Sequence, residues 1–96
     1  MAHYFVAQIK INDQNEYDKY LDKFDNIFSK YKGDILAVDE SPVVLEGNWS
    51  YTKSVIVKFP SKNDFNDWYF SDEYQRILKY RLSAAHCDTI LVEGID

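Results

Sequence analysis

Apolar residues gather in several short stretches of the chain, and these stretches are rich in residues that favour β-strands. The pattern predicts strands at residues 4–11, 53–59 and 87–94. Residues 34–47 are also rich in Val, Ile and Leu. A proline interrupts a strand, so residues 34–47 are predicted to form two extended pieces with a bend at Ser41 and Pro42.

Two other stretches follow the three- and four-residue spacing of an amphipathic helix. The first is expected to begin at Asp13, because an acid with Glu16 three residues later has the form of a capping box. Gly33 is its expected end. The second stretch begins at Ser61 and is interrupted at Ser71, a further predicted N-cap, so we expect two short helices there.

The resulting order of elements is β-α-β-β-α-β, with the second helical stretch broken in two. This order is typical of the ferredoxin-like split βαβ fold. We therefore predict a single α+β domain over residues 1–96, built on a four-stranded antiparallel sheet. Right-handed crossovers would place both helical layers on one face of that sheet.

The predicted strands carry apolar residues on both of their faces. In the first strand, Phe5 and Ala7 alternate with Tyr4 and Val6, and a similar mixture occurs in the strands at 53–59 and 87–94. A sheet with one face in water shows cleaner alternation. Because one chain has no element left to cover the second face, we expect a homodimer. Its sheets would stack and bury on the order of 1,000 Å² or more in total.

Composition and charge exclude several classes of partner. A chain of 96 residues with a net charge of −5 lacks the basic surface that nucleic-acid binding requires. No apolar run approaches the roughly 20 residues of a membrane span, so no membrane partner is expected. The first residues do not resemble a signal peptide. The single cysteine, Cys87, fits a reducing compartment, and we expect a cytoplasmic protein.

Sequence signatures of metal or cofactor sites are not found, and we expect neither. His86 and Cys87 are adjacent, but neighbouring side chains in a strand point to opposite faces and do not form a pair of metal ligands. The three glycines are isolated, so no glycine-rich phosphate loop is present.

Arg81 is the most informative single residue, because it falls within the apolar stripe of the last predicted helix. A guanidinium keeps its charge when buried, so Arg81 requires an acceptor there. Glu46, an acid in an otherwise apolar segment, is the candidate partner. Two interpretations follow. Arg81 presents its fork to a ligand carboxylate, or Arg81 and Glu46 form a structural ion pair.

Four aromatic residues, Trp49, Trp68, Tyr69 and Tyr74, are the other candidates for a ligand site. The last three lie on both sides of the break at Ser71, so a kinked pair of helices would spread them around an apolar hollow with a few polar groups. The alternative is that these rings fill the space between helices and sheet. For the tyrosines, both interpretations stay open because a phenol requires a polar partner.

Several segments together resemble a known family. In chain order they are LEGNW (45–49), VIVKFPS (55–61), WYFSDEYQ (68–75) and Arg81. They resemble the family called domain of unknown function 1330 over nearly the whole chain. The resemblance implies membership of the dimeric α+β barrel superfamily, in which two ferredoxin-like sheets pair into a barrel.

The resemblance leaves two functions open, because relatives in the superfamily include monooxygenases, isomerases and haem-handling proteins. One is a non-catalytic homodimer with a small-molecule-binding cleft between helices and sheet. The other is a cofactor-independent enzyme, monooxygenase-like or isomerase-like, acting on a small aromatic or acidic metabolite. In it Arg81 would orient the substrate, and Glu46 or Tyr74 would move a proton. Where the family usually shows Gly-Gly-Arg, residues 32–34 are Lys-Gly-Asp, which removes a basic group available to an anion.

Overall fold

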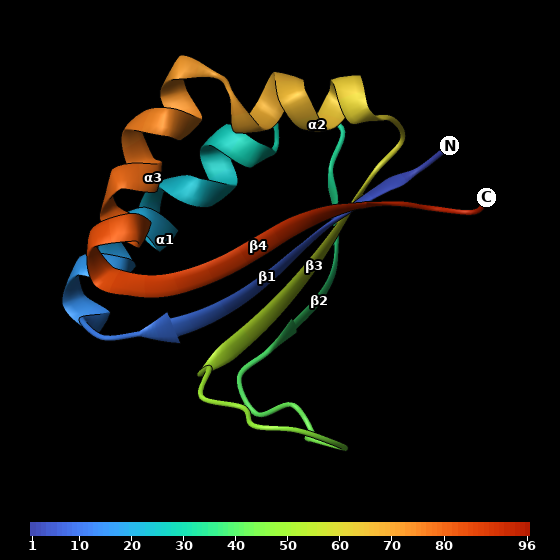
Figure 1. Cartoon of the computed structure of the whole chain (residues 1–96). Coiled ribbons are helices and arrows are strands. Elements are labelled where there is room, and N and C mark those ends of the chain that lie inside the picture. The colour runs from blue at the N-terminus through green and yellow to red at the C-terminus, as the bar shows by residue number, and fades with distance from the viewer.

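A computed structural model describes all 96 residues and shows a four-stranded antiparallel sheet with three helices on one face (Figure 1). The elements are β1 (His3–Ile11), α1 (Gln14–Phe28), β2 (Asp34–Asp39), β3 (Lys53–Phe59), α2 (Lys62–Tyr69), α3 (Asp72–Ala84) and β4 (Ala85–Glu93). The strand order is β2-β3-β1-β4. The predicted ferredoxin-like arrangement is therefore confirmed, including the break in the second helical stretch.

The three helices begin where the sequence predicts. The side chains of Asp13, Ser61 and Ser71 each accept a hydrogen bond from the backbone N–H three residues later, at 3.1, 3.1 and 3.2 Å. The capping box at the first helix is only half formed, because the Glu16 carboxylate pairs with Lys19 instead. None of the helices has the length and apolar composition that crossing a membrane requires.

The end of the first helix differs from the prediction. Helix α1 ends at Phe28, and Gly33, its predicted stop, lies just before β2 without a positive φ. A β-carbon at Gly33 would overlap the rings of Phe28 and Phe59. The glycine is therefore explained by close packing of two aromatic rings, and not by a left-handed helix cap.

The second of the two predicted extended pieces is not a strand. Residues 40–50, which we call the arm, leave the end of β2 and project on the side of the sheet opposite the helices (Figure 1). Two apolar side chains near the tip of the arm are almost fully exposed, Val43 at 85% and Leu45 at 89%. Pro42 lacks an N–H, and no neighbouring strand pairs with the arm, so its β-forming residues build no ladder.

The apolar core lies between the sheet and the helices and is dominated by aromatic rings. Trp68 stacks on Phe59 with ring centroids 5.5 Å apart and meets the edge of Phe28 at 5.4 Å. This packing fills the layer beneath α2. Helix α1, in contrast, packs mainly against α3, and the inner sheet face near β2 is left partly uncovered.

The opposite, outer face of the sheet has no helix over it. Val6 lies between Ile56 on β3 and Ile90 on β4, so an apolar row crosses the sheet. The next row on this face places Tyr4 between Lys58 and Val92. Apolar side chains therefore occupy both faces of the sheet, as the mixed alternation of the strands predicted.

Candidate functional site

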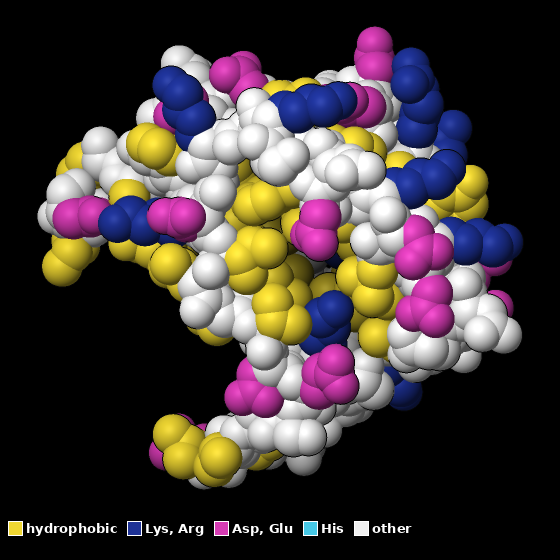
Figure 2. All heavy atoms as spheres, turned by 180° about the vertical axis from the view of Figure 1, so that it is seen from behind, with side chains coloured by type: hydrophobic (Ala, Val, Ile, Leu, Met, Phe, Trp, Pro, Cys, Tyr) yellow, Lys and Arg dark blue, Asp and Glu magenta, His cyan; other side chains and the backbone are white.

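A cavity of about 220 Å³ lies between α1 and the inner face of the sheet. Figure 2 shows it as a hollow with apolar walls and basic atoms at its base. The side chains around it come from both layers of the fold, the sheet and the helices: Phe5, Ala7, Ile9, Tyr17, Tyr20, Leu21, Phe24, Asp25, Ile35, Val38, Lys53, Val55, Val57, Trp68 and Arg81. The cavity exists because α1 packs against α3 and leaves the strands at the β2 edge without a helix above them.

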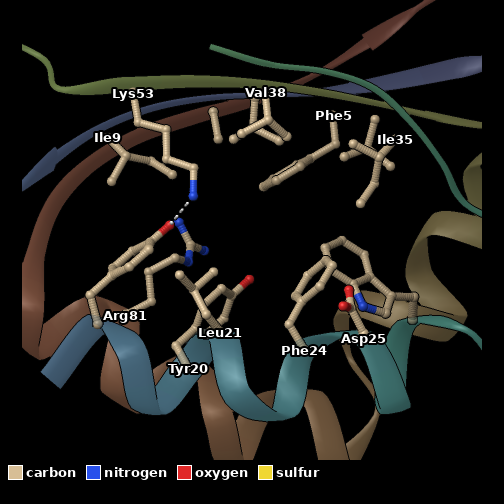
Figure 3. A pocket seen from close by; sticks show the side chains of 15 residues that line it. Phe5, Ile9, Tyr20, Leu21, Phe24, Asp25, Ile35, Val38, Lys53 and Arg81 are labelled. Atoms are coloured by element: carbon tan, nitrogen blue, oxygen red, sulfur yellow. Dashed lines mark hydrogen bonds between the residues drawn. The ribbon is translucent and has the colours of Figure 1, made fainter. Parts of the chain in front are cut away.

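Arg81 reaches this cavity from the last turn of α3 and is only 2% exposed. Its guanidinium points into the hollow from the helical side (Figure 3). The Nε and Nη1 atoms are buried and have no hydrogen-bond partner. The charge also lies close to the ring of Tyr20, whose centroid is 5.8 Å from Cζ. A buried guanidinium with unused donors is therefore present at the wall of the cavity.

Lys53 brings a second positive group to the cavity from the start of β3. It is 8% exposed, and its Nζ donates a 3.4 Å hydrogen bond to the hydroxyl of Tyr17 (Figure 3). Burial lowers the pKa of the Lys53 ammonium below its usual value, and the charge of Glu40 only partly opposes this. No carboxylate lies within ion-pair distance of Lys53.

Sequence reasoning missed Lys53 as a site residue, although a signal was present. Lys53 has the same parity in its strand as Val55, Val57 and Phe59, which all point towards the core. A lysine at an inward-facing position of a strand requires an explanation, because ammonium groups are rarely buried. Tyr17 and Tyr20 were also missed, since their helical spacing predicts core packing alone.

Two tyrosines link the cavity to the layer behind it. The hydroxyl groups of Tyr20 and Tyr74 share a buried hydrogen bond of 2.7 Å. Burial raises the pKa of Tyr74 and raises that of Tyr20 well above its usual value, while burial raises the pKa of Tyr17 to about 12. All three phenols are therefore protonated at neutral pH and can donate hydrogen bonds near the cavity.

Glu46 does not reach Arg81 in the chain. It lies on the arm, is exposed, and makes no ion pair, so the structural pairing of Glu46 with Arg81 is not formed. The expectation failed because it placed Glu46 on a strand beside the helix, whereas the arm leaves the sheet on the other side. Asp25 is the acid at the rim of the cavity, and it makes no ion pair either.

The four predicted aromatic site residues occupy different places. Trp68 lines the cavity and is also central to the core. Tyr69 and Tyr74 lie behind the wall, where Tyr69 stacks on Phe65 at 5.2 Å and Tyr74 bonds to Tyr20. Trp49 is on the arm, where it packs against Tyr51 with ring centroids 5.0 Å apart. The structure thus brings Arg81 and Trp68 together at the cavity and leaves Glu46 and Trp49 outside it.

The chemistry of the cavity is that of two cations in an apolar space. No group of three His, Cys, Asp or Glu side chains is arranged to hold a metal ion. A guanidinium and an ammonium both attract oxygen anions, and the guanidinium offers the planar fork that matches a carboxylate. The arrangement therefore suits an organic anion better than a cation or a metal.

Solved structures with the same fold share little sequence with this chain. A protein of unknown function from Rhodopseudomonas palustris aligns with a TM-score of 0.81 at 15% identity, covering 99% of this chain and 83% of that chain. A dimeric ferredoxin-like protein of unknown function from Jannaschia sp. CCS1 has a TM-score of 0.74 at 10% identity, with 98% and 100% covered. SnoaB, a cofactor-independent oxygenase from Streptomyces nogalater, has a TM-score of 0.69 at 9% identity, with 99% and 94% covered. At these identities the likeness establishes the fold alone.

Sequence comparison gives the family. No curated protein matches the chain. A family match extends over residues 2–95 and so includes every element of the sheet, all three helices and the arm. The three segments that carry the resemblance, among them the one that ends in Trp49, lie within it, as does Arg81. The chain therefore belongs to the family described as Domain of unknown function (DUF1330).

Proposed function

We propose that this protein is a homodimer that binds a small organic molecule in the cavity beneath α1. The observation that carries the binding site is the buried Arg81 guanidinium, which lines an apolar hollow and whose Nε and Nη1 have no hydrogen-bond partner. Leaving buried donors of a charged group unpaired costs more than the one to three kcal/mol typical of a neutral group. A ligand that accepts these hydrogen bonds would recover that free energy, which is a reason for the site to be occupied.

The outer face of the sheet supports the homodimer. The row formed by Ile56, Val6 and Ile90 is apolar, and in one chain Ile90 is 60% exposed and the neighbouring Val92 is 42% exposed. Polar residues such as Gln8 border this row, as at the rim of an interface. Dimeric ferredoxin-like proteins are among those with the same fold, which supports stacking of two such sheets.

The position of the arm is a second, independent argument for the homodimer. It projects beyond the uncovered face, so a second copy stacked on that face would lie beside it (Figure 1). Val43 and Leu45 expose nearly their whole side chains in one chain, and burying them would contribute about 1.5–3 kcal/mol each. We expect the arm to pack on the partner subunit, with Glu46 at the edge of that contact.

Native mass spectrometry of protein purified from its own host tests both parts at once. We expect a mass of two chains and an additional small mass that is lost at higher collision energy. A monomer at micromolar concentration would overturn the dimer. Absence of any retained ligand, together with no binding in a screen of small aromatic compounds detected by NMR, would overturn the binding function.

Catalysis without a cofactor is the second candidate function, and one observation favours it. Among the groups at the cavity, only Lys53 has a pKa that moves towards neutrality, so it is the candidate base. Glu46 is outside the cavity, and the pKa of Tyr74 moves away from neutrality. Conversion of a bound compound by the wild type but not by Lys53→Met would establish this alternative.

A further inference from the structure

We propose that the ligand is a small aromatic carboxylate, held through its carboxylate by Arg81 and Lys53 and through its ring by the walls of the cavity. This inference rests on the binding function proposed above and adds the chemical class of the ligand. It also assigns a role to Lys53, which lies on the opposite wall from Arg81 (Figure 3).

The first argument is the charge of the cavity. Two basic side chains are buried at its walls, and neither has an acid within ion-pair distance. Two carboxylates are near, since Asp25 lies on the rim and Glu40 follows β2, but both are exposed to water. Buried charges in proteins are paired as a rule, so the missing counter-charge is expected to come from a ligand.

The second argument distinguishes a monoanion from a phosphate. Arg81 lies in the last turn of α3, where the helix dipole places partial negative charge close to the guanidinium. The cavity faces the middle of α1 and not its N-terminus, so no row of free N–H groups is available to a phosphate. One fork and one ammonium, partly offset by a helix end, suit a single carboxylate.

The third argument is the shape and lining of the remaining space. Twelve of the fifteen residues around the cavity are hydrophobic, and they include the rings of Phe5, Tyr20, Phe24 and Trp68. An apolar cavity of about 150 Å³ is known to hold benzene. The cavity of about 220 Å³ therefore has room for one aromatic ring and a carboxylate on a short stem.

Titration with matched probes tests the proposal. Benzoate and phenylacetate carry the ring and the charge, while benzamide and benzyl alcohol keep the ring without the charge, and inorganic phosphate keeps charge without the ring. Binding is measured by calorimetry and by NMR shifts of the side chains at the cavity. We expect one of the two carboxylates to bind at least about tenfold more tightly than its neutral counterpart and than phosphate.

Two substitutions assign the contacts. Arg81→Lys keeps the charge but loses the fork, and Lys53→Met removes the charge but keeps a similar stem; each is expected to weaken carboxylate binding about tenfold or more. Lys58→Met is the matched control, because Lys58 lies on the same strand and on the outer face. Its affinity for the carboxylate should equal that of the wild type. Circular dichroism and thermal unfolding confirm that each variant is folded.

The outcomes separate this inference from the function on which it rests. If benzyl alcohol or benzamide binds as tightly as the carboxylates, or if Lys53→Met binds them as well as the wild type, the assignment of the ligand class is overturned while the binding function stands. If no probe binds and native mass spectrometry finds no retained molecule, both are overturned. Selective carboxylate binding that is lost in both cavity variants and kept in Lys58→Met supports the proposal.

Discussion

The layer between helices and sheet has two ends with similar composition and different packing. Beneath α2, Phe59 and Phe28 pack against Trp68 through stacked and edge-on rings, and Trp68 lies at the border between this filled end and the cavity. Beneath α1, the rings of Phe24 and Tyr20 form one wall of a cavity whose other features are Arg81 and Lys53. The chain therefore places aromatic residues in both a core and a hollow.

The cause of the difference is the position of the helices. The short helix α2 contacts β1 and β3 of the sheet, whereas α1 packs mainly against α3. A hollow with buried charge lowers stability, whereas a filled aromatic cluster raises it. The two ends are expected to respond differently to substitution.

The largest expected effect is at the filled end. Trp68→Ala removes a ring that is almost fully buried and leaves a cavity, so we expect the free energy of unfolding to fall by about 3–5 kcal/mol. Phe24→Ala at the hollow end should cost only about 1–2 kcal/mol, because that ring is half-buried beside existing space. Chemical denaturation measures both, and equal losses would contradict the comparison.

A smaller effect concerns the phenol of Tyr17 at the hollow end. Its folded pKa of about 12 lies above the usual value of 10.0, so the unfolded chain loses its proton first as the pH rises. Stability from this group is complete below pH 10 and falls as the pH rises to 12, by about 2 kcal/mol. Tyr17→Phe should unfold with a weaker pH dependence over that range. An unchanged dependence would show that the phenol is not buried as described.

Lys53→Met is expected to stabilise the hollow end by about 1 kcal/mol at pH 7, because an unpaired buried charge is replaced by an apolar side chain. Among the titratable groups around Lys53, Tyr17 accepts its hydrogen bond, Arg81 lines the same cavity, and the charge of Glu40 opposes the lowering of its pKa. Because the folded pKa lies below 10.5, the unfolded chain binds more protons between the two values. Wild-type stability should therefore rise with pH in that window, and the variant should lose this rise.

Lys58→Met provides the control for that measurement. Lys58 is half-buried on the outer face, where it pairs with Asp96 at 3.7 Å. Its substitution should change stability by no more than about 0.5 kcal/mol and should leave the pH dependence intact. If both lysine variants behaved alike, the special environment of Lys53 would be refuted.

The smallest expected effect on the stability of a single chain comes from a substitution in the arm. Leu45 is almost fully exposed and is not part of the core, so Leu45→Asp should change the stability of the monomer by less than about 0.5 kcal/mol. The dimer, however, should dissociate at a higher concentration, as measured by analytical ultracentrifugation. Leu82→Asp is the control, because Leu82 is 59% exposed on the helical layer, away from the arm and the outer face. Equal dissociation of the two variants would contradict a role for the arm.

Local patterns in the sequence were sufficient to predict the elements. A run of β-forming residues located β3 over residues 53–59 without error, and Asp13, Ser61 and Ser71 located the three helix starts. These signals act over a few residues, through side-chain spacing and the hydrogen bonding of free N–H groups, and do not depend on distant parts of the chain. The burial of Arg81 was predicted for the same reason, since its helix face is set by spacing.

The cavity and its charges were decided by the tertiary structure. Which acid reaches Arg81 depends on the path of the arm, and the arm carries Glu46 away from it. The hollow depends on α1 packing on α3, a contact between distant segments that no local spacing encodes; Tyr20 and Tyr74, which bond across it, are 54 residues apart. Lys53 and Arg81 meet at one cavity only because β3 and the end of α3 are brought together by the whole fold. Residue type and spacing thus determined the elements, while long-range packing determined the site.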